Sequence, residues 1–128
     1  MNNCICGSGK AFSHCCEPLL RGKILAKTPE QLMRSRFSAY ALGGHGEYLL
    51  KTWFAPMAKG LTIEELSSQD LQWKSLEVLG SGVKDSQGWV EFKATYTDEG
   101  RNKILHEKSV FTLNGASWFY IGGEIKSA

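Results

Sequence analysis

The sequence lacks any apolar run long enough to cross a lipid bilayer, so we expect no membrane-spanning segment. Its beginning, MNNCICGSGK, lacks the basic start and the apolar stretch of a secretory signal, and we therefore expect a cytoplasmic protein whose thiols stay reduced. It also lacks a strong charge of either sign. The formal net charge of +2 is too small to indicate direct nucleic-acid binding, which usually comes with a large basic excess.

The chain of 128 residues also lacks internal repeats and low-complexity tracts. Its length suits one ordinary domain with at most a small appendage. The composition changes after residue 27, because the first 27 residues hold all four cysteines and four cations against the single acid Glu17. We therefore predict a small cysteine-containing unit over residues 1–22 and a larger domain over residues 28–128.

The larger domain opens with the signals of a helix start. Thr28 fits an N-cap, Pro29 fits the first helical position, and Gln31 follows the cap at the spacing of a capping box. Gly43 and Gly44 supply the residues that favour a left-handed helix end. The apolar stripe of this helix comprises Leu32, Met33, Phe37, Tyr40 and Ala41.

Two shorter helices are predicted after it. One spans residues 47–54 and is stopped by Pro56, and the other follows an N-cap at Thr62, with Glu65 at the capping-box position.

The pattern changes from residue 71 onward to β-rich segments separated by turn residues. Four antiparallel strands are predicted, at residues 71–83, 88–97, 103–113 and 117–125. Asn114 and Gly115 form a strong hairpin signal between the last two, because both tolerate positive φ. Helices followed by such a meander predict an α+β domain in which the helices pack on one face of a curved antiparallel sheet and leave a concavity between the layers.

All four cysteines lie within the stretch CICGSGKAFSHCC, from Cys4 to Cys16. Four thiolates so close in sequence can form a tetrahedron around one soft ion such as Zn²⁺, and a site of four cysteines leaves no open position, which indicates a structural metal. Gly7 and Gly9 can adopt positive φ and let backbone N–H groups approach the sulfurs, while Lys10 and His14 could offset the site's negative charge.

Two other interpretations of this stretch compete with the metal site. A phosphate-binding loop would need Gly at position 4 and Ser or Thr at position 11, where the chain has Cys4 and Ala11. A redox role for the adjacent Cys15 and Cys16 stays open, although a disulfide between neighbours is strained and redox motifs usually separate the two cysteines by two residues.

The pattern C-x-C-G-S-G-K followed by C-C resembles the SEC-C motif, the zinc knuckle at the C-terminus of the translocase motor SecA. The resemblance covers residues 4–18 and implies one structural Zn²⁺. The implied ligands are Cys4, Cys6, Cys15 and Cys16. The last ligand is commonly His in this motif and is Cys16 here, so His14 falls outside the set.

In SecA the knuckle docks to the chaperone SecB and to the ribosome. The resemblance therefore implies a protein-contact role for a basic, partly apolar rim, which we call the basic rim and which comprises Lys10, Phe12, Arg21 and Lys23. The alternative is that these residues only cover the knuckle. Nucleic-acid contact beyond the ribosome is not indicated.

The segments MRSRFSAY, YLLKTW and LHEKSVF resemble those of the YchJ-like proteins, which pair a SEC-C knuckle with an NTF2-like, cystatin-like α+β domain. Together the two resemblances cover nearly the whole chain. They imply a cone-shaped sheet wrapped around the long first helix, and they supply no activity that can be carried over to this chain.

The third predicted strand places a carboxylate on an apolar face. Side chains alternate between the two faces of a strand, which places His106 on the outer face. The inward-facing side chains are then Leu105, Glu107, Ser109, Phe111 and Leu113. Because a buried carboxylate is costly unless paired, we predict an Arg36–Glu107 pair near the concavity. It is either a structural salt bridge or, with Tyr40 and Trp53, the polar anchor of a ligand pocket.

Three functional hypotheses follow. The favoured one is a zinc-binding, non-enzymatic adaptor that docks to a ribosome, a SecB-type chaperone or another protein through its N-terminal knuckle. The second is a small-molecule binder or enzyme with a pocket around Glu107, Arg36 and Tyr40. The third is metal storage or redox sensing by the knuckle. His106 is interpreted as a surface histidine, because no partnered nucleophile is identifiable.

Overall fold

Helix α2 (Pro29–Leu42) lies at the centre of the computed structural model, which describes residues 3–126. The predicted capping is confirmed: the backbone N–H of Gln31 donates to the Thr28 hydroxyl at 3.0 Å. The helix ends at Gly43, which has a φ of 74°. Three short helices accompany it: α1 (Glu17–Leu20), α3 (Gly46–Lys51) and α4 (Ile63–Ser67), the last capped by Thr62.

The predicted helix over residues 47–54 is wrong at its end, because α3 ends at Lys51. Backbone pairing with the sheet takes the place of the last helical turn. The N–H of Phe54 donates to the Tyr120 carbonyl and the N–H of Tyr120 donates to the Thr52 carbonyl, both at 2.8 Å. A single 3₁₀ turn, η2 (Ala55–Met57), follows and contains the predicted stop at Pro56.

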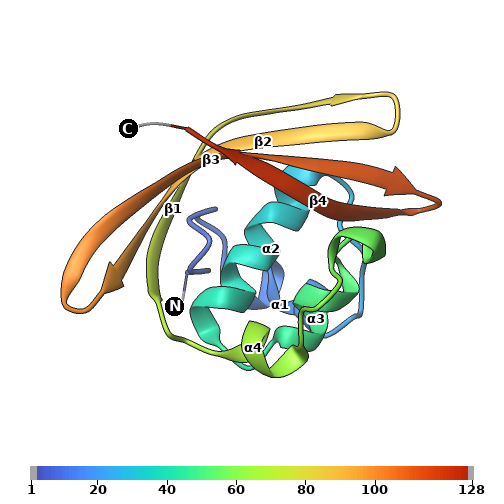
Figure 1. The fold of residues 1–128 in the computed structure, drawn as a ribbon. Coiled ribbons are helices and arrows are strands. Elements are labelled where there is room, and N and C mark those ends of the chain that lie inside the picture. Colours follow the sequence, from blue (N-terminus) through green and yellow to red (C-terminus); the bar gives the residue numbers. More distant parts are fainter. Residues whose placement is uncertain (1–2, 127–128) are drawn as a thin grey trace.

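The four predicted strands form one antiparallel meander in the order β1-β2-β3-β4. Their bounds are β1 (Gln72–Lys84), β2 (Gln87–Asp98), β3 (Arg101–Asn114) and β4 (Ser117–Ile125). The hairpin at Asn114 and Gly115 is confirmed, and Gly115 has a φ of 66°. The sheet curves over α2, with the other helices beyond α2 (Figure 1).

The inward face predicted for the third strand is also confirmed. Ser109 and Phe111 are buried, and Phe37 of α2 meets Trp73 of β1 edge to face with ring centres 6.1 Å apart. The α+β class is therefore as expected, with helices on one face of a curved antiparallel sheet.

The N-terminal segment packs into the same core as the rest of the chain. It contains the 3₁₀ turn η1 (Phe12–His14) and α1. Cys6, Cys16 and Leu19 are almost fully buried and belong to one hydrophobic cluster with Leu32 of α2 and Val90 of β2. The division into residues 1–22 and 28–128 stays a prediction, and the packing between the two parts is continuous.

Within residues 3–126, none of the helices has the length and the apolar character that crossing a bilayer requires.

Candidate functional site

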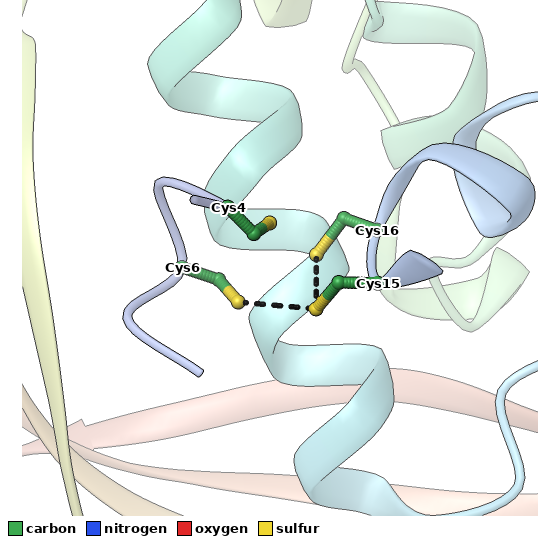
Figure 2. Close-up of side chains that lie close together, drawn as sticks. All are labelled: Cys4, Cys6, Cys15 and Cys16. Atoms are coloured by element: carbon green, nitrogen blue, oxygen red, sulfur yellow. Dashed lines mark hydrogen bonds between the residues drawn. The ribbon is translucent and has the colours of Figure 1, made fainter. Parts of the chain in front are cut away.

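The four cysteines converge from two segments that lie beside α2. Cys4 and Cys6 are on the N-terminal loop, Cys15 and Cys16 lie just before α1, and the side chains point toward one another (Figure 2). All four Sγ atoms lie within 4.8 Å of one another. Neighbouring sulfurs are 3.6 Å apart between Cys6 and Cys15 and 3.9 Å apart between Cys15 and Cys16, and all four are free thiols.

These distances fit a tetrahedral metal site. A Zn–S bond of about 2.3 Å requires sulfurs about 3.8 Å apart, close to the observed separations. Three of the four cysteines are buried and Cys15 is half-buried, so the protein shields most of the cluster from solvent. The residues therefore fit one soft ion such as Zn²⁺, in a site with no ligand position left for a substrate.

The loop between the two cysteine pairs has the conformation that its glycines predict. Gly7 and Gly9 have φ of 79° and 85°. A side chain at residue 7 would also meet the carbonyl oxygen of Leu76, 2.8 Å from the Cβ position, so the loop lies directly against β1. The Cys4 N–H donates to the Lys10 carbonyl at 2.8 Å and closes the turn.

Side chains outside the cysteine stretch hold this loop on α2. The Arg34 Nη1 donates to the Cys6 carbonyl at 2.6 Å, and the Ser38 hydroxyl lies 3.6 Å from the Cys4 sulfur. Within the cysteine stretch itself, the Ser8 hydroxyl lies 3.1 Å from the Cys15 sulfur. The sequence prediction missed Arg34 and Ser38. Ser38 follows Cys4 by 34 residues, and nothing local relates the two.

The thiols differ in their readiness to ionise. Hydrogen bonding from Cys16, together with the side chain and the backbone N–H of Ser8, lowers the pKa of Cys6 to about 4 against the opposing effect of burial. The pKa of Cys16 is raised, because its proton is held against Cys6 and its sulfur is buried. A thiolate at Cys6 is the form of cysteine that binds a metal.

The basic rim lies on the outside of this unit. Lys10, Arg21 and Lys23 are exposed, whereas Phe12 is half-buried and packs against the core cluster. Arg21 pairs with Glu17 at 3.5 Å, one helical turn away. His14 is also exposed, and the cluster of residues that could hold a metal ion comprises the four cysteines without it.

A cavity of about 440 Å³ lies between α2 and the sheet. The structure brings the four predicted pocket residues together in its lining, namely Arg36, Tyr40, Trp53 and Glu107. The remaining walls are mostly aromatic and aliphatic. Whether the cavity binds a ligand stays a prediction.

The predicted Arg36–Glu107 pair is wrong, because no salt bridge joins these two described side chains. The Arg36 Nη1 instead donates to the Leu49 carbonyl and the Thr52 hydroxyl, both at 2.7 Å. Its guanidinium lies over the rings of Trp53 and Tyr120, at 4.8 and 4.7 Å from their centres. Burial lowers the pKa of Arg36, and the neighbouring tyrosines oppose that shift.

Glu107 has hydroxyl partners instead of a cation. The Ser109 hydroxyl donates to its Oε2 at 2.6 Å, and the Tyr120 hydroxyl reaches the same oxygen at 3.4 Å. Burial and the nearby Glu107 carboxylate raise the pKa of Tyr120. Gly123 of β4 faces this carboxylate, since a Cβ there would meet the Glu107 side chain.

Sequence reasoning missed Tyr120 and assigned Trp73 only to the core. Both line the cavity, and Tyr120 contacts both Arg36 and Glu107. Alternation along β4 could have placed Tyr120 on the same face as the buried Trp118. His106 lies on the other face of the sheet and pairs with Glu91 at 2.7 Å, outside the cavity lining.

The chain is similar to proteins that share both of its parts. The family model described as "YchJ, middle NTF2-like domain" matches residues 28–123, and the SEC-C motif matches residues 2–18. A UPF0225 protein of Geobacter sulfurreducens is 40% identical over 95% of this chain and 78% of that protein. A UPF0225 protein of Sodalis glossinidius is 36% identical over 94% of this chain and 81% of that protein.

Two solved structures resemble the whole chain. The solution structure of a SEC-C motif containing protein from Rhodopseudomonas palustris has a TM-score of 0.90 and 36% identity, covering 98% of this chain and 100% of that one. The crystal structure of a SEC-C motif containing protein from Psychrobacter arcticus has a TM-score of 0.81 and 27% identity, covering 98% and 83%. The chain therefore belongs to the family of YchJ-like proteins, with a SEC-C motif ahead of its NTF2-like domain.

Proposed function

We propose that the protein holds one structural Zn²⁺ through Cys4, Cys6, Cys15 and Cys16 and acts as a non-enzymatic, cytoplasmic adaptor that docks to a protein partner. The observation that carries the metal proposal is the convergence of four thiol sulfurs within 4.8 Å of one another. A bound ion would supply four strong bonds that join the N-terminal loop to the start of α1. The closed ligand set supports a structural role.

The protein's own residues set where this knuckle sits. Arg34 and Ser38 of α2 contact the Cys4–Cys6 loop, and Leu19 of α1 is buried beside Leu32. The knuckle is thus fixed to the helix that forms the centre of the fold. A partner bound to the knuckle would be held rigidly with respect to the rest of the protein.

The surface next to the knuckle supports the docking proposal. Ile24 and Leu25 follow Lys23 directly and are 46% and 53% exposed. Lys23 has no ion-pair partner among residues 3–126. Exposed aliphatic side chains beside unpaired cations complement a protein surface that carries both acidic and apolar groups.

A protein surface is favoured over RNA as the direct contact. Phosphate recognition relies on many cations and comes with a strong basic excess, whereas this chain has a net charge of only +2. The resemblance to the SecA knuckle makes a SecB-type chaperone and the ribosome the first partners to test.

The test compares two double variants of the zinc-loaded chain. Lys10→Glu with Lys23→Glu reverses charges of the basic rim, and Lys59→Glu with Lys84→Glu makes the same change at exposed sites elsewhere. Purified SecB-type chaperone and purified ribosomes are the binding targets, and elemental mass spectrometry gives the zinc content. We expect one zinc per chain in all samples and loss of binding only in the rim variant. Equal binding by both variants, or equal loss, would contradict docking through the rim.

Small-molecule binding in the cavity is a second candidate function. Its specific support is a cavity of about 440 Å³, within the usual range of ligand sites, that holds the buried Arg36 and the carboxylate of Glu107 among apolar walls.

A further inference from the structure

The cavity contains a buried cation that no carboxylate balances. Arg36 is only 5% exposed, and none of the acids described in residues 3–126 lies within ion-pair distance of it. Buried charges in proteins are normally paired, because removing an ion from water is costly. Glu107, which lines the same cavity from β3, accepts hydrogen bonds from the hydroxyls of Ser109 and Tyr120 instead.

Arg36 also keeps hydrogen-bond donors for a ligand. Leu49 and Thr52 use the two N–H groups of Nη1, and a further side-chain hydrogen bond joins Arg36 to Tyr40. This leaves two of the five guanidinium N–H groups on a side chain that lines the cavity. The rings of Trp53 and Tyr120 lie against the guanidinium and fix its orientation. A planar guanidinium held in this way is preorganised for a planar, two-oxygen acceptor.

A second donor next to Arg36 lacks an acceptor. The indole Nε1 of Trp53 is buried and has no hydrogen-bond partner. It is enclosed, so a ligand would reach it only if the ring turned, and Arg36 is therefore the primary contact. The remaining N–H groups of Arg36 and the indole N–H of Trp53 are donors, so the group that would complement this end of the cavity is an acceptor.

The charge and shape of the lining narrow the ligand class. Glu65, Asp70 and Glu107 also border the cavity, and they would repel a group with more than one negative charge. A phosphate is thereby disfavoured against a carboxylate. The apolar walls suit a ring or a branched hydrocarbon; they include Phe37, Trp73, Phe92, Leu105 and Phe111.

We propose that this cavity binds a small monocarboxylate with an apolar, ring-sized body, the carboxylate lying against the free N–H groups of Arg36. This rests on the second candidate function, small-molecule binding in the cavity, and adds the chemical class of the ligand. A carboxylate would balance the buried charge of Arg36 and leave the hydrocarbon part against the aromatic walls.

The experiment titrates the full-length, ¹⁵N-labelled, zinc-loaded chain with matched compounds and follows the tryptophan indole N–H resonances. The probes are benzoate, phenylacetate, 3-phenylpropionate and indole-3-acetate, each beside its neutral amide, together with phenethylamine and inorganic phosphate. We expect at least one of the carboxylates to shift the Trp53 resonance saturably. Its amide should bind roughly tenfold more weakly or worse, because the charge-assisted hydrogen bonds are lost.

Three variants locate the site. Arg36→Lys keeps the charge and removes the planar fork, and we expect roughly tenfold weaker binding of the carboxylate. Trp53→Phe identifies the Trp53 indole resonance by its disappearance, and binding to this variant is followed by the indole resonance of Trp73, which also lines the cavity. Because a ring over Arg36 is retained, it is the milder variant if Arg36→Lys does not fold, and we expect it to weaken binding roughly twofold to fivefold. Trp89→Phe removes an indole that does not line the cavity and should leave binding unchanged.

The outcomes separate the ligand class from the function. Tighter binding of a carboxylate than of its amide, weakened by Trp53→Phe and not by Trp89→Phe, supports the proposal. If the amides, the amine or phosphate shift the Trp53 resonance as strongly as the carboxylates, the class is wrong while the cavity function stands. If no compound shifts it, both the class and the cavity function are overturned.

Discussion

The guanidinium carbon of Arg36 lies 4.7 Å from the centre of the Tyr120 ring, and the hydroxyl of the same tyrosine lies 3.4 Å from Glu107. Tyr120 therefore stands between the two charged residues of the cavity. The ring face attracts the cation and the phenolic hydroxyl donates to the carboxylate, so one side chain contacts both charged groups without bringing them together. This arrangement keeps both charged groups at the cavity.

Replacing Tyr120 should separate these two contributions. Tyr120→Phe keeps the ring under Arg36 and removes a long hydrogen bond, so we expect a loss of about 0.5–1 kcal/mol in the free energy of unfolding. Tyr120→Leu also removes the ring and should cost about 2–3 kcal/mol. Urea unfolding measures both.

Tyr96→Phe is the matched control for the loss of a hydroxyl. The ring of Tyr96 packs on Trp73 with centres 4.9 Å apart, and Tyr96 is only half-buried, so the loss of its hydroxyl should be nearly neutral. If Tyr120→Leu cost no more than Tyr120→Phe, the ring would have no role in holding Arg36.

Removing the metal should loosen more than the knuckle. Cys6 and Cys16 are buried in one cluster with Leu32 and Val90, so chelation would free two segments that cover the core. We expect a strong chelator at neutral pH to lower the free energy of unfolding by a few kcal/mol and the midpoint temperature by roughly 10 °C or more. Differential scanning calorimetry with and without added zinc measures the effect.

Two controls accompany the chelation experiment. Restoring zinc should restore the midpoint, and a Cys6→Ser variant should melt at the low temperature whether or not chelator is present. An unchanged midpoint after complete metal removal would show that the thiols themselves, through their contacts with Ser38 and Ser8, hold the segments in place.

Much of the secondary structure follows from local sequence signals. The caps at Thr28 and Thr62 act over three residues, and alternation along β3 depends only on period two, so the sequence predicts them directly. The cysteine cluster is equally local, since only eleven residues lie between Cys4 and Cys16 and the segment between the two pairs contains two glycines with positive φ. For this reason the spacing of the cysteines is enough to predict that they cluster.

The rest depends on contacts between distant segments. Residues 52–54 leave the helix because Thr52 and Phe54 pair with Tyr120, a partner more than sixty residues away. Charge alone suggests Glu107 as the partner of Arg36, whereas the fold offers Arg36 two aromatic rings and two oxygen acceptors nearer by. No periodicity in the sequence predicts which of these groups Arg36 contacts.

Deleting residues 1–22 should destabilise the remaining domain. Leu19 is 2% exposed and Cys16 is 1% exposed, and both belong to the hydrophobic cluster that also contains Leu32. Because their removal exposes apolar core, we expect residues 23–128 to lose several kcal/mol of stability or their cooperative unfolding. Thermal unfolding followed by near-ultraviolet circular dichroism measures this. A truncated chain that melts cooperatively at the full-length temperature would show two independent domains.

The glycines of the knuckle offer a matched pair of substitutions. Gly7 and Gly9 both have positive φ, at 79° and 85°, but a Cβ at residue 7 would meet the Leu76 carbonyl oxygen at 2.8 Å while a Cβ at residue 9 meets open space. Gly9→Ala should therefore cost only the left-handed strain, about 1–2 kcal/mol. Gly7→Ala adds a clash with backbone and should cost roughly 1–2 kcal/mol more.

The same clash should weaken metal binding in Gly7→Ala, because the loop can relieve it only by moving Cys6 away from the other sulfurs. Competition with a chromophoric chelator measures zinc affinity, and we expect the loss to be larger for Gly7→Ala than for Gly9→Ala. Equal affinities in the two variants would mean that contact with β1 does not position the loop. A lower zinc affinity in Gly9→Ala than in Gly7→Ala would instead mean that the conformation of the turn from Ser8 to Lys10 positions the sulfurs. In this turn the Lys10 N–H donates to the Ser8 hydroxyl at 3.1 Å.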